Sequence, residues 1–412
     1  MRTLLPVRTI SAALGVTLAL LVSARTEPNR ETAFHHGINI TRLFDSPKLQ
    51  GGAYADPPFA PWTNELAVAE LNRLRNAGFD FIRLPIDPGP FLALDDAGAS
   101  RALEPIFDFI HTAFREGFAV DVDLHPRPGS RDWSPSALLD SPAGPKFVRY
   151  EHFVEMLAAR LQSDHAGRQA LELMNEPQSP CVRTNGPDWT QFQQQLYAAA
   201  RKVAPSLNLI VTGGCFSSID GLSNLDLRAL RDSNLYVMIH FYEPFPFTHQ
   251  GASWSPYSRY LAGLRYPIRS EDRPTAEAAT QAWVQHLNLA GSAQDSASSQ
   301  AGKQLDQYFA RPLNKDAIGR RFDAAASWAA SVGLPRSHVI IGEFGVMNEG
   351  GGLGTSPADG AARVAWLHDV ASEADAHGFG WAVWGYHGGF GIVSEDSSRT
   401  IDPEVVSALF GN

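Results

Sequence analysis

The stretch Val339-Ile340-Ile341-Gly342-Glu343-Phe344 (VIIGEF, 339–344) is an apolar run that carries one carboxylate near its end. A strand with so few polar residues fits a parallel sheet covered on both faces, because such strands have no solvent-facing side. Segments of helical length and amphipathic pattern separate it from similar runs. Eight such runs follow one another along the chain, at 34–40, 79–86, 118–125, 170–175, 207–212, 235–242, 338–344 and 380–385.

This alternation predicts an α/β fold, and eight strand–helix units that close on themselves form a (β/α)8 TIM barrel. A doubly wound open sheet is the competing architecture, but no Gly-x-Gly-x-x-Gly follows the first strand. We expect a single barrel domain over residues 25–412. Its predicted helices span 64–76, 100–116, 146–162, 188–203, 315–331 and 357–377, with shorter ones at 224–231 and 403–410.

A long segment after the sixth strand interrupts the alternation. Residues 243–313 separate that strand from its helix and are rich in aromatic side chains. Loops of this length are usually functional or disordered, and loops that follow barrel strands lie at the active-site face. We expect an insertion beside the cleft, with a decoration that does not touch substrate as the alternative. Its Ser/Ala/Gln tract, 292–300, is expected to be flexible.

The composition narrows the class of protein. Of the 412 residues, 44% are hydrophobic and 19% charged, which suits a large core and excludes wholesale disorder. Asp and Glu (44) outnumber Lys and Arg (34), giving a net charge of −10. Because no basic patch stands out, nucleic acid is not an expected partner.

The N-terminus has the pattern of an export signal. Arg2 and Arg8 precede or adjoin an uncharged run, 10–22, and small residues follow at Val22-Ser23-Ala24. The pattern predicts a signal peptide over residues 1–24, with an uncleaved anchor as the alternative. We therefore expect a secreted or periplasmic monomer with no membrane span after cleavage.

The chain contains only two cysteines, Cys181 and Cys215. In an oxidising compartment they could pair, closing a loop of about 34 residues and stabilising the fold by roughly 3–4 kcal/mol. Two free buried thiols are the alternative.

Polar side chains gather where the predicted strands end. They are Arg83, His125, Asn175, Glu176, His240, Tyr242, Glu343 and Trp384. In a barrel these ends converge on one cleft. Side chains alternate along a strand, so Asp121, Asp123 and His125 share one face, as do His240 and Tyr242. Burying unpaired polar groups costs several kcal/mol each, so we expect these side chains to form one network.

Two of these residues, Glu176 and Glu343, offer a pair of carboxylates across the cleft. Cleavage of a glycoside requires one carboxylic acid to protonate the leaving oxygen and a second carboxylate to attack the anomeric carbon or activate water. Glu176 precedes the rigid Pro177, and Arg83 is expected near Glu343, where it would keep that carboxylate ionised. We therefore assign Glu176 as acid/base and Glu343 as nucleophile.

The chain resembles glycoside hydrolase family 5, the family of many cellulases, within the clan of retaining barrel glycosidases. The resemblance covers nearly all of the chain after residue 34. Its motifs occur in order: Gly-Ile-Asn at Asn39, Ile-Arg-Leu-Pro at Arg83, Asp-Leu-His at His125, Met-Asn-Glu-Pro at Asn175 and Glu176, His-Phe-Tyr at His240 and Tyr242, Gly-Glu-Phe-Gly at Glu343, and Trp384.

The resemblance implies a role for each matched residue. Glu176 would be acid/base and Glu343 nucleophile, with the configuration retained and the carboxylates about 5–5.5 Å apart. Asn175 would bind the sugar 2-hydroxyl, and Arg83 and Tyr242 would hold the nucleophile. The remaining side chains would line the subsite beside the cleavage point, His125 and His240 at its sides and Trp384 beneath the sugar.

The expected activity is hydrolysis of a β-linked glucan polysaccharide or oligosaccharide, most directly as an endo-β-1,4-glucanase. A β-mannanase and a β-1,3-glucanase of the same family are alternatives, because a few loop hydrogen bonds decide the sugar. A more remote alternative is a barrel that binds carbohydrate without catalysing a reaction. An open cleft would favour endo action, whereas a cleft closed by residues 243–313 would favour exo action or a branched substrate.

Three tryptophans in loops after strands, Trp62, Trp133 and Trp254, are candidate sugar-stacking surfaces, with ordinary packing as the alternative. No metal or other cofactor is expected. The adjacent His35 and His36 must point to opposite faces of their strand, so they cannot act as a pair of metal ligands.

Overall fold

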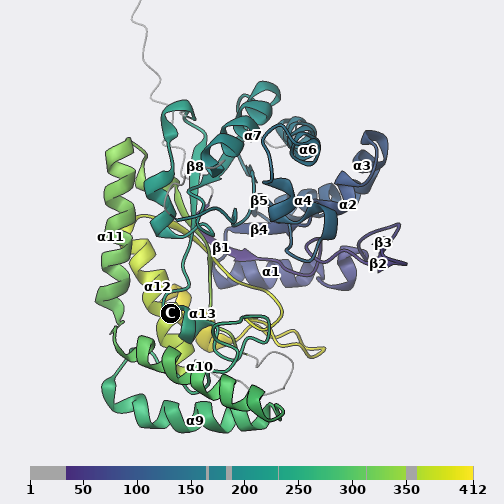
Figure 1. Ribbon diagram of the computed structural model, residues 1–412. Coiled ribbons are helices and arrows are strands. Elements are labelled where there is room, and N and C mark those ends of the chain that lie inside the picture. The colour runs from purple at the N-terminus through teal and green to yellow at the C-terminus, as the bar shows by residue number, and fades with distance from the viewer. Residues whose placement is uncertain are drawn as a thin grey trace, which may run out of the picture. The chain divides into compact units, whose positions relative to one another are not determined.

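The computed structural model describes residues 34–163, 167–181, 188–230, 232–311, 313–348 and 360–411, and eight parallel strands within them close into a barrel (Figure 1). Neighbours around the barrel follow the order β1-β10-β9-β8-β7-β6-β5-β4. The barrel strands are β1 (His36–Asn39), β4 (Phe81–Ile86), β5 (Ala119–Leu124), β6 (Gln169–Glu172), β7 (Asn208–Thr212), β8 (Leu235–His240), β9 (Val339–Phe344) and β10 (Gly380–Val383). The predicted (β/α)8 TIM barrel and its eight strands are confirmed.

Long helices lie between the strands, largely where the sequence predicts them. They are α1 (Val68–Ala77), α4 (Glu104–Arg115), α6 (Pro145–Gln162), α7 (Trp189–Val203), α11 (Lys315–Val332), α12 (Gly360–His377) and α13 (Pro403–Phe410). The helix predicted over 100–116 is instead two helices, because α3 (Asp96–Ala102) ends before α4 begins. Pro105 lies in the first turn of α4, where its missing N–H costs nothing.

Short elements complete the described chain. They are the β2 (Leu49–Gln50) and β3 (Ala53–Tyr54) hairpin, α2 (Gly89–Leu92), α5 (Pro135–Leu138), and the 3₁₀ turns η1 (Trp62–Asn64), η2 (Arg131–Trp133), η3 (Ile219–Asn224), η4 (Leu227–Ala229) and η6 (Arg336–His338). The turns η3 and η4 stand where one short helix over 224–231 is predicted.

The insertion between β8 and α11 is largely helical. It contains α8 (Phe245–Thr248), η5 (Ser270–Asp272), α9 (Arg273–His286) and α10 (Ser292–Phe309), and α9 packs on α10 (Figure 1). The expectation that the tract 292–300 is flexible is wrong, because it forms the first half of α10. Ala297, Ala301, Leu305 and Tyr308 recur at helical spacing and are buried, so the polar composition hides an apolar stripe.

The barrel interior has an apolar layer below a polar one. The apolar layer consists of Phe34, Phe81, Ala119, Ala170, Ile210, Tyr236, Met238, Ile340 and Ala382. Because side chains on a strand alternate, the next inward positions lie two residues further along. Phe81 is followed by Arg83, Ala119 by Asp121, and Ala170 by Glu172. The polar groups therefore lie above a closed apolar floor, toward the C-terminal ends of the strands.

Cys181 and Cys215 form a disulfide, which decides between the two alternatives left by the sequence. The predicted signal peptide, residues 1–24, lies outside the described residues. Within the described part of the chain, no helix has the length and apolar character needed to cross a membrane.

Candidate active site

An open cleft of about 1910 Å³ lies over the C-terminal ends of the strands. Six of the side chains predicted from the sequence line it: His125, Glu176, His240, Tyr242, Glu343 and Trp384. They come from the ends of β5, β6, β8, β9 and β10 or from the short segments that follow these strands. The barrel thus brings together residues that are far apart in the sequence.

A β-bulge turns Glu343 into the cleft. The pairing of β8 with β9 shifts between Ile239 and His240, so that Ile239 faces Ile341 but His240 faces Glu343. A bulge re-aims the side chains that follow it, and here both Gly342 and Glu343 meet the interior. Gly342 leaves room for Met238, whose Sδ would lie 2.0 Å from an added Cβ. The Glu343 side chain is almost fully buried at the cleft floor.

Two groups hold the Glu343 carboxylate in place. Arg83 Nη1 donates to Glu343 Oε1 at 2.7 Å, and Tyr242 Oη donates to Glu343 Oε2 at 3.0 Å. Burial and the adjacent Glu343 carboxylate raise the pKa of Tyr242 well above its usual value, so the phenol keeps its proton and remains a donor. Both oxygens are thereby fixed in direction.

Glu176 lies across the cleft floor beside His240. Its Oε1 is 2.9 Å from His240 Nδ1, and that nitrogen is 3.6 Å from Glu343 Oε2. Burial raises the pKa of Glu176 to about 7 and lowers the pKa of His240 to about 4. Near neutral pH, Glu176 can therefore hold a proton while the His240 ring is neutral.

His125 forms one wall of the cleft. Its Nδ1 lies 2.7 Å from Asp123 Oδ2, and its ring stacks on Trp384 with centroids 5.7 Å apart. Burial alone would lower the pKa of His125, but the Asp123 carboxylate outweighs it and raises the pKa to about 9. His125 therefore places a positive charge beside the cleft at neutral pH.

Arg83 and Asn39 lie beneath the cleft rather than on its surface. Both side chains are fully buried and neither lines the cleft, and Arg83 holds Glu343 as the resemblance implies. Arg83 Nη1 also donates to Asn39 Oδ1 at 2.9 Å, and Asn39 Nδ2 donates to the Gly342 carbonyl at 2.8 Å. The two residues support the bulge that carries Glu343. Asn175 is also nearly buried, and its Oδ1 accepts from Arg83 Nη2 at 2.9 Å.

The sequence reasoning did not single out Glu172 as a site residue, although it pairs directly with Arg83. Its two carboxylate oxygens accept from Arg83 Nε at 2.8 Å and Nη2 at 3.0 Å. Burial raises the pKa of Glu172 to about 7, and burial together with Glu172 raises the pKa of Asp121 well above its usual value. Alternation from the inward-facing Ala170 would have identified Glu172.

Replacing Arg83 should show how much of the free energy of unfolding depends on its positive charge. In Arg83→Met, four carboxylates lose their shared cation: Asp121, Asp123, Glu172 and Glu343. Breaking a buried ion pair from one side costs about 3–5 kcal/mol, so we expect a loss of that size in urea unfolding at pH 7. The loss should shrink as pH falls, because protonation removes the unpaired charges.

The control for Arg83→Met is Arg273→Met, which removes a surface guanidinium that pairs with Glu277 and Asp306. Exposed ion pairs contribute only about 0–1 kcal/mol to the free energy of unfolding, so this control should lose little stability. Equal losses in the two variants would contradict the importance of the buried cluster.

The same residues are close enough to hold a metal ion. The ligand atoms of Glu176, His240 and Glu343 all lie within 4.8 Å of one another. Each already has a partner in this arrangement, since His240 Nδ1 contacts Glu176 and Tyr242 donates to Glu343. In this arrangement the three side chains form one hydrogen-bonded network.

Aromatic side chains extend the cleft away from these groups. Trp133 and Trp254 line it, as proposed from their positions, whereas Trp62 is buried and donates to Asp108 Oδ2 at 2.9 Å. Phe216, Phe245 and Tyr257 also line the cleft and are exposed. Phe245 and Tyr257 belong to the aromatic-rich insertion that was expected beside the cleft, whereas no sequence pattern singled out Phe216. The first part of the insertion thus contributes to the cleft, while the lining contains no residue of α9 or α10.

A parallel eight-stranded barrel with two glutamates at the floor of an open cleft has the architecture of a barrel glycoside hydrolase. Residues 57–388 match the family model described as cellulase, glycosyl hydrolase family 5. The match covers most of the chain, and the protein belongs to this family of glycoside hydrolases.

Several curated relatives are named endoglucanases, and the chain resembles them at low identity. The chain is 25% identical over 387 residues to Endoglucanase 3 of Fibrobacter succinogenes, an alignment that covers 89% of this chain and 52% of that protein. It is 25% identical over 348 residues to Endoglucanase C of Acetivibrio thermocellus, covering 82% and 89% of the two chains. The chain thus spans about half the length of the first relative and most of the second.

Solved structures share the fold. Thermotoga maritima Cel5A in complex with cellobiose superposes with a TM-score of 0.66 at 19% identity, covering 92% of this chain and 98% of that one. The cellulose synthase subunit Z of Clostridioides difficile gives a TM-score of 0.64 at 22% identity, covering 92% and 99%. At these identities the likeness extends to the fold alone.

Proposed function

We propose that this protein is a retaining endo-β-glucanase that acts most directly on β-1,4-linked glucan, with Glu343 as nucleophile and Glu176 as acid/base. The observation that carries the proposal is the pair of glutamates at the floor of a cleft of about 1910 Å³ that is also lined by exposed aromatic side chains. The family and the curated endoglucanases support the same class of reaction.

The proposed reaction has two displacements. In the first, a Glu343 oxygen attacks the anomeric carbon, the bond to the leaving oxygen breaks, and Glu176 gives that oxygen its proton. In the second, water attacks the glycosyl ester, Glu176 accepts a proton from the water, and the Glu343 carboxylate is released. The pKa of about 7 for Glu176 suits a group that must first give and then take a proton.

The separation of the two glutamates favours retention. Their nearest ligand atoms lie within 4.8 Å. Inverting glycosidases need about 6.5–9.5 Å between carboxyl groups, because a water molecule must fit beside the sugar. The shorter separation of Glu176 and Glu343 therefore supports the retaining alternative.

The distribution of exposed apolar side chains favours endo action. Of the eight exposed large apolar residues among those described, six line the cleft: Leu49, Leu94, Phe216, Phe245, Trp254 and Tyr257. They come from loops after β1 and β4 and from loops after β7 and β8, which lie on opposite sides of the barrel. A glycan chain could therefore extend past the carboxylates in both directions.

The experiment that tests this proposal is product analysis on carboxymethylcellulose, mixed-linkage glucan, glucomannan, galactomannan and laminarin. A ladder of oligomers from the first two is expected. Release from galactomannan alone would instead favour a β-mannanase. That alternative is kept because Thermotoga maritima Cel5A, a structural neighbour, has also been solved with mannotriose. Release from laminarin alone would favour a β-1,3-glucanase.

Removing one exposed aromatic should weaken binding of long chains. Trp254 is 62% exposed and lines the cleft, so Trp254→Ala should lower kcat/KM on a soluble glucan by about tenfold, the equivalent of 1.4 kcal/mol. The effect should fall mainly on KM. The matched control is Val148→Ala, an exposed apolar residue outside the cleft, and equal values for the two variants would contradict a role for Trp254.

We also propose that the protein is exported and monomeric. The pattern of residues 1–24 and the Cys181–Cys215 disulfide support an oxidising compartment. Only Val68 and Val148 of the eight exposed large apolar residues lie outside the cleft, which leaves little apolar surface for a partner copy. N-terminal sequencing of the protein from a native secretion fraction, and its mass in solution, test these two points.

A further inference from the structure

The turn after β7 holds several residues in a strained backbone conformation. Cys215, Phe216 and Ser217 have φ values of 52°, 54° and 56°, and Glu176 has a φ of 38°. Residues with a Cβ rarely adopt this left-handed region, and consecutive ones persist only where the surroundings impose them. The proposed acid/base and its neighbouring turn therefore share one strained patch.

The turn contacts both the loop that follows Glu176 and the strand that carries His240. The Phe216 N–H donates to the Pro177 carbonyl at 3.4 Å, and the His240 N–H donates to the Ser217 carbonyl at 2.8 Å. Gly214 lies so close to the same loop that an added Cβ would be 2.3 Å from Ser179 Oγ. The turn is thus a brace between Glu176 and its imidazole partner.

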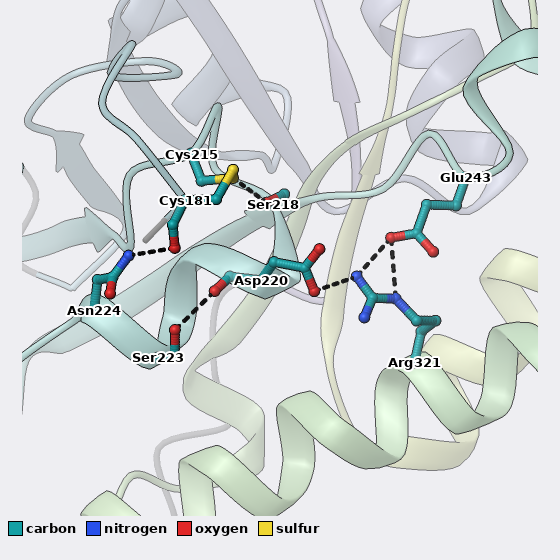
Figure 2. The surroundings of a disulfide bond; sticks show 8 residues. All are labelled: Cys181, Cys215, Ser218, Asp220, Ser223, Asn224, Glu243 and Arg321. Atoms are coloured by element: carbon teal, nitrogen blue, oxygen red, sulfur yellow. Dashed lines mark hydrogen bonds and ion pairs between the residues drawn. A yellow bond between two sulfur atoms is a disulfide. The ribbon is translucent and has the colours of Figure 1, made fainter. Parts of the chain in front are cut away.

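The disulfide closes this brace covalently. It joins Cys215 in the turn to Cys181 in the loop after Glu176, and Ser218 Oγ donates to Cys215 Sγ at 3.1 Å (Figure 2). Asn224 Nδ2 donates to the Cys181 carbonyl at 2.7 Å, which ties Cys181 to the 3₁₀ turn η3 as well. Cys181 is exposed, so the bond can be reached by a reductant.

The same region connects to the residue beside Tyr242. Asp220, in the 3₁₀ turn that follows, accepts from Arg321 Nη2 at 2.9 Å, and that nitrogen also donates to Glu243 Oε1 at 2.7 Å (Figure 2). This link is made by side chains at the surface and does not touch Glu176. The turn that carries the disulfide, in contrast, contacts the loop after Glu176 and the backbone of His240.

We propose that the Cys181–Cys215 disulfide is a positioning element for proton transfer, holding the Glu176 carboxyl and the His240 ring in their 2.9 Å contact. The inference rests on the proposed role of Glu176 as acid/base. Without the bond, the turn can relax out of its left-handed conformation, and the Pro177 and Ser217 carbonyls move with it. Glu176 then protonates the leaving oxygen less efficiently. Glu343 keeps its orientation, because Arg83 and Tyr242 still hold it.

The test compares two substrates that differ in their need for an acid. A cello-oligosaccharide has a poor leaving group, whereas a 2,4-dinitrophenyl cellobioside leaves without protonation. In Cys181→Ser/Cys215→Ser, we expect kcat/KM on the oligosaccharide to fall about tenfold, because small misplacements of catalytic groups are costly. The value of kcat/KM on the activated glycoside should stay unchanged, and the oligosaccharide KM should change little.

Reduction of the folded wild type provides a second route that does not depend on refolding a variant. Dithiothreitol supplies two electrons and two protons, the S–S bond becomes two thiols, and the reagent closes to its cyclic disulfide. Assays well below the melting temperature should show the same selective loss. Tyr266→Phe serves as a stability control, because it removes a hydrogen bond to Asp369 away from the cleft, and it should leave the ratio of the two substrates unchanged.

A rescue variant tests whether backbone strain in the turn connects the disulfide to the activity. Glycine adopts positive φ without cost, and the buried Ser217 hydroxyl has no hydrogen-bond partner among the described residues. Ser217→Gly in the cysteine-free background should therefore restore part of the oligosaccharide activity. Equal losses on both substrates, no loss, or no rescue would overturn the inference. A disulfide-bonded wild type inactive on both substrates would overturn the proposed function itself.

Discussion

Glu343→Gln should abolish turnover while the protein remains folded. A neutral amide is a poor nucleophile, and loss of a residue that forms the covalent intermediate lowers kcat by on the order of 10⁴–10⁶-fold. The variant should fold because glutamine has the same shape, and Arg83 keeps its contacts with Glu172 and Asp123. Circular dichroism and thermal melting establish the fold, and release of reducing sugar measures the activity.

Covalent trapping identifies the nucleophile directly. An activated 2-deoxy-2-fluoro glycoside slows the second displacement more than the first, so the glycosyl ester should accumulate in the wild type. Mass spectrometry of the digested protein should then find the label on the peptide that contains Glu343. Glu155→Gln is the matched control, because Glu155 is a surface residue paired with Lys202. Label on another carboxylate, or substantial activity in folded Glu343→Gln, would sink the assignment.

The barrel and the floor of its cleft could be predicted from the sequence because both follow from local patterns. Apolar runs of strand length, such as 339–344, repeat with helices between them, and this repetition specifies a closed parallel sheet. Polar residues at the strand ends then converge whatever the details of the loops. Alternation also places Asp121 and Asp123 on one inward face, and the structure confirms their contact with Arg83.

The parts that could not be predicted depend on contacts between distant segments. The bulge that turns Glu343 inward is visible only in the register between β8 and β9. Burial of Asn39 and Arg83 below the cleft follows from the thickness of the polar layer, which a motif does not encode. Whether Trp62 stacks on a sugar or packs in the core is decided by Asp108, a residue of another helix.

Helix α10 shows another reason why a prediction from sequence can fail. Composition of the tract 292–300 suggests a flexible linker, yet alanine and glutamine are good helix formers and the helix continues to Phe309. Its buried stripe includes Leu305 and Tyr308, which lie beyond the tract. The prediction failed because the window ended before the residues that anchor the helix.

Glu176→Ala should separate the two substrate classes more strongly than any other variant. A general acid contributes about 10²–10⁴-fold, so kcat/KM on a cello-oligosaccharide should fall by that factor. On a 2,4-dinitrophenyl cellobioside, kcat/KM should barely change, because the first displacement no longer needs a proton. Its kcat should still fall, since the second displacement has lost its base. A parallel fall in kcat/KM on both substrates would count against an acid role.

The pH profile gives an independent check on the same residue. Glu176 must hold its proton to act as an acid, and burial raises its pKa to about 7, so wild-type kcat/KM on the oligosaccharide should decline as pH rises through about 7. His240, with a pKa lowered to about 4 by burial, is already neutral in this range and cannot produce that limb. The high-pH limb should therefore disappear in Glu176→Ala.

Azide should restore turnover of the activated glycoside by Glu176→Ala and yield a β-glycosyl azide. The reason is that azide attacks the Glu343 ester from the face that Glu176 has vacated. An α-azide would mean that the two glutamates have exchanged roles.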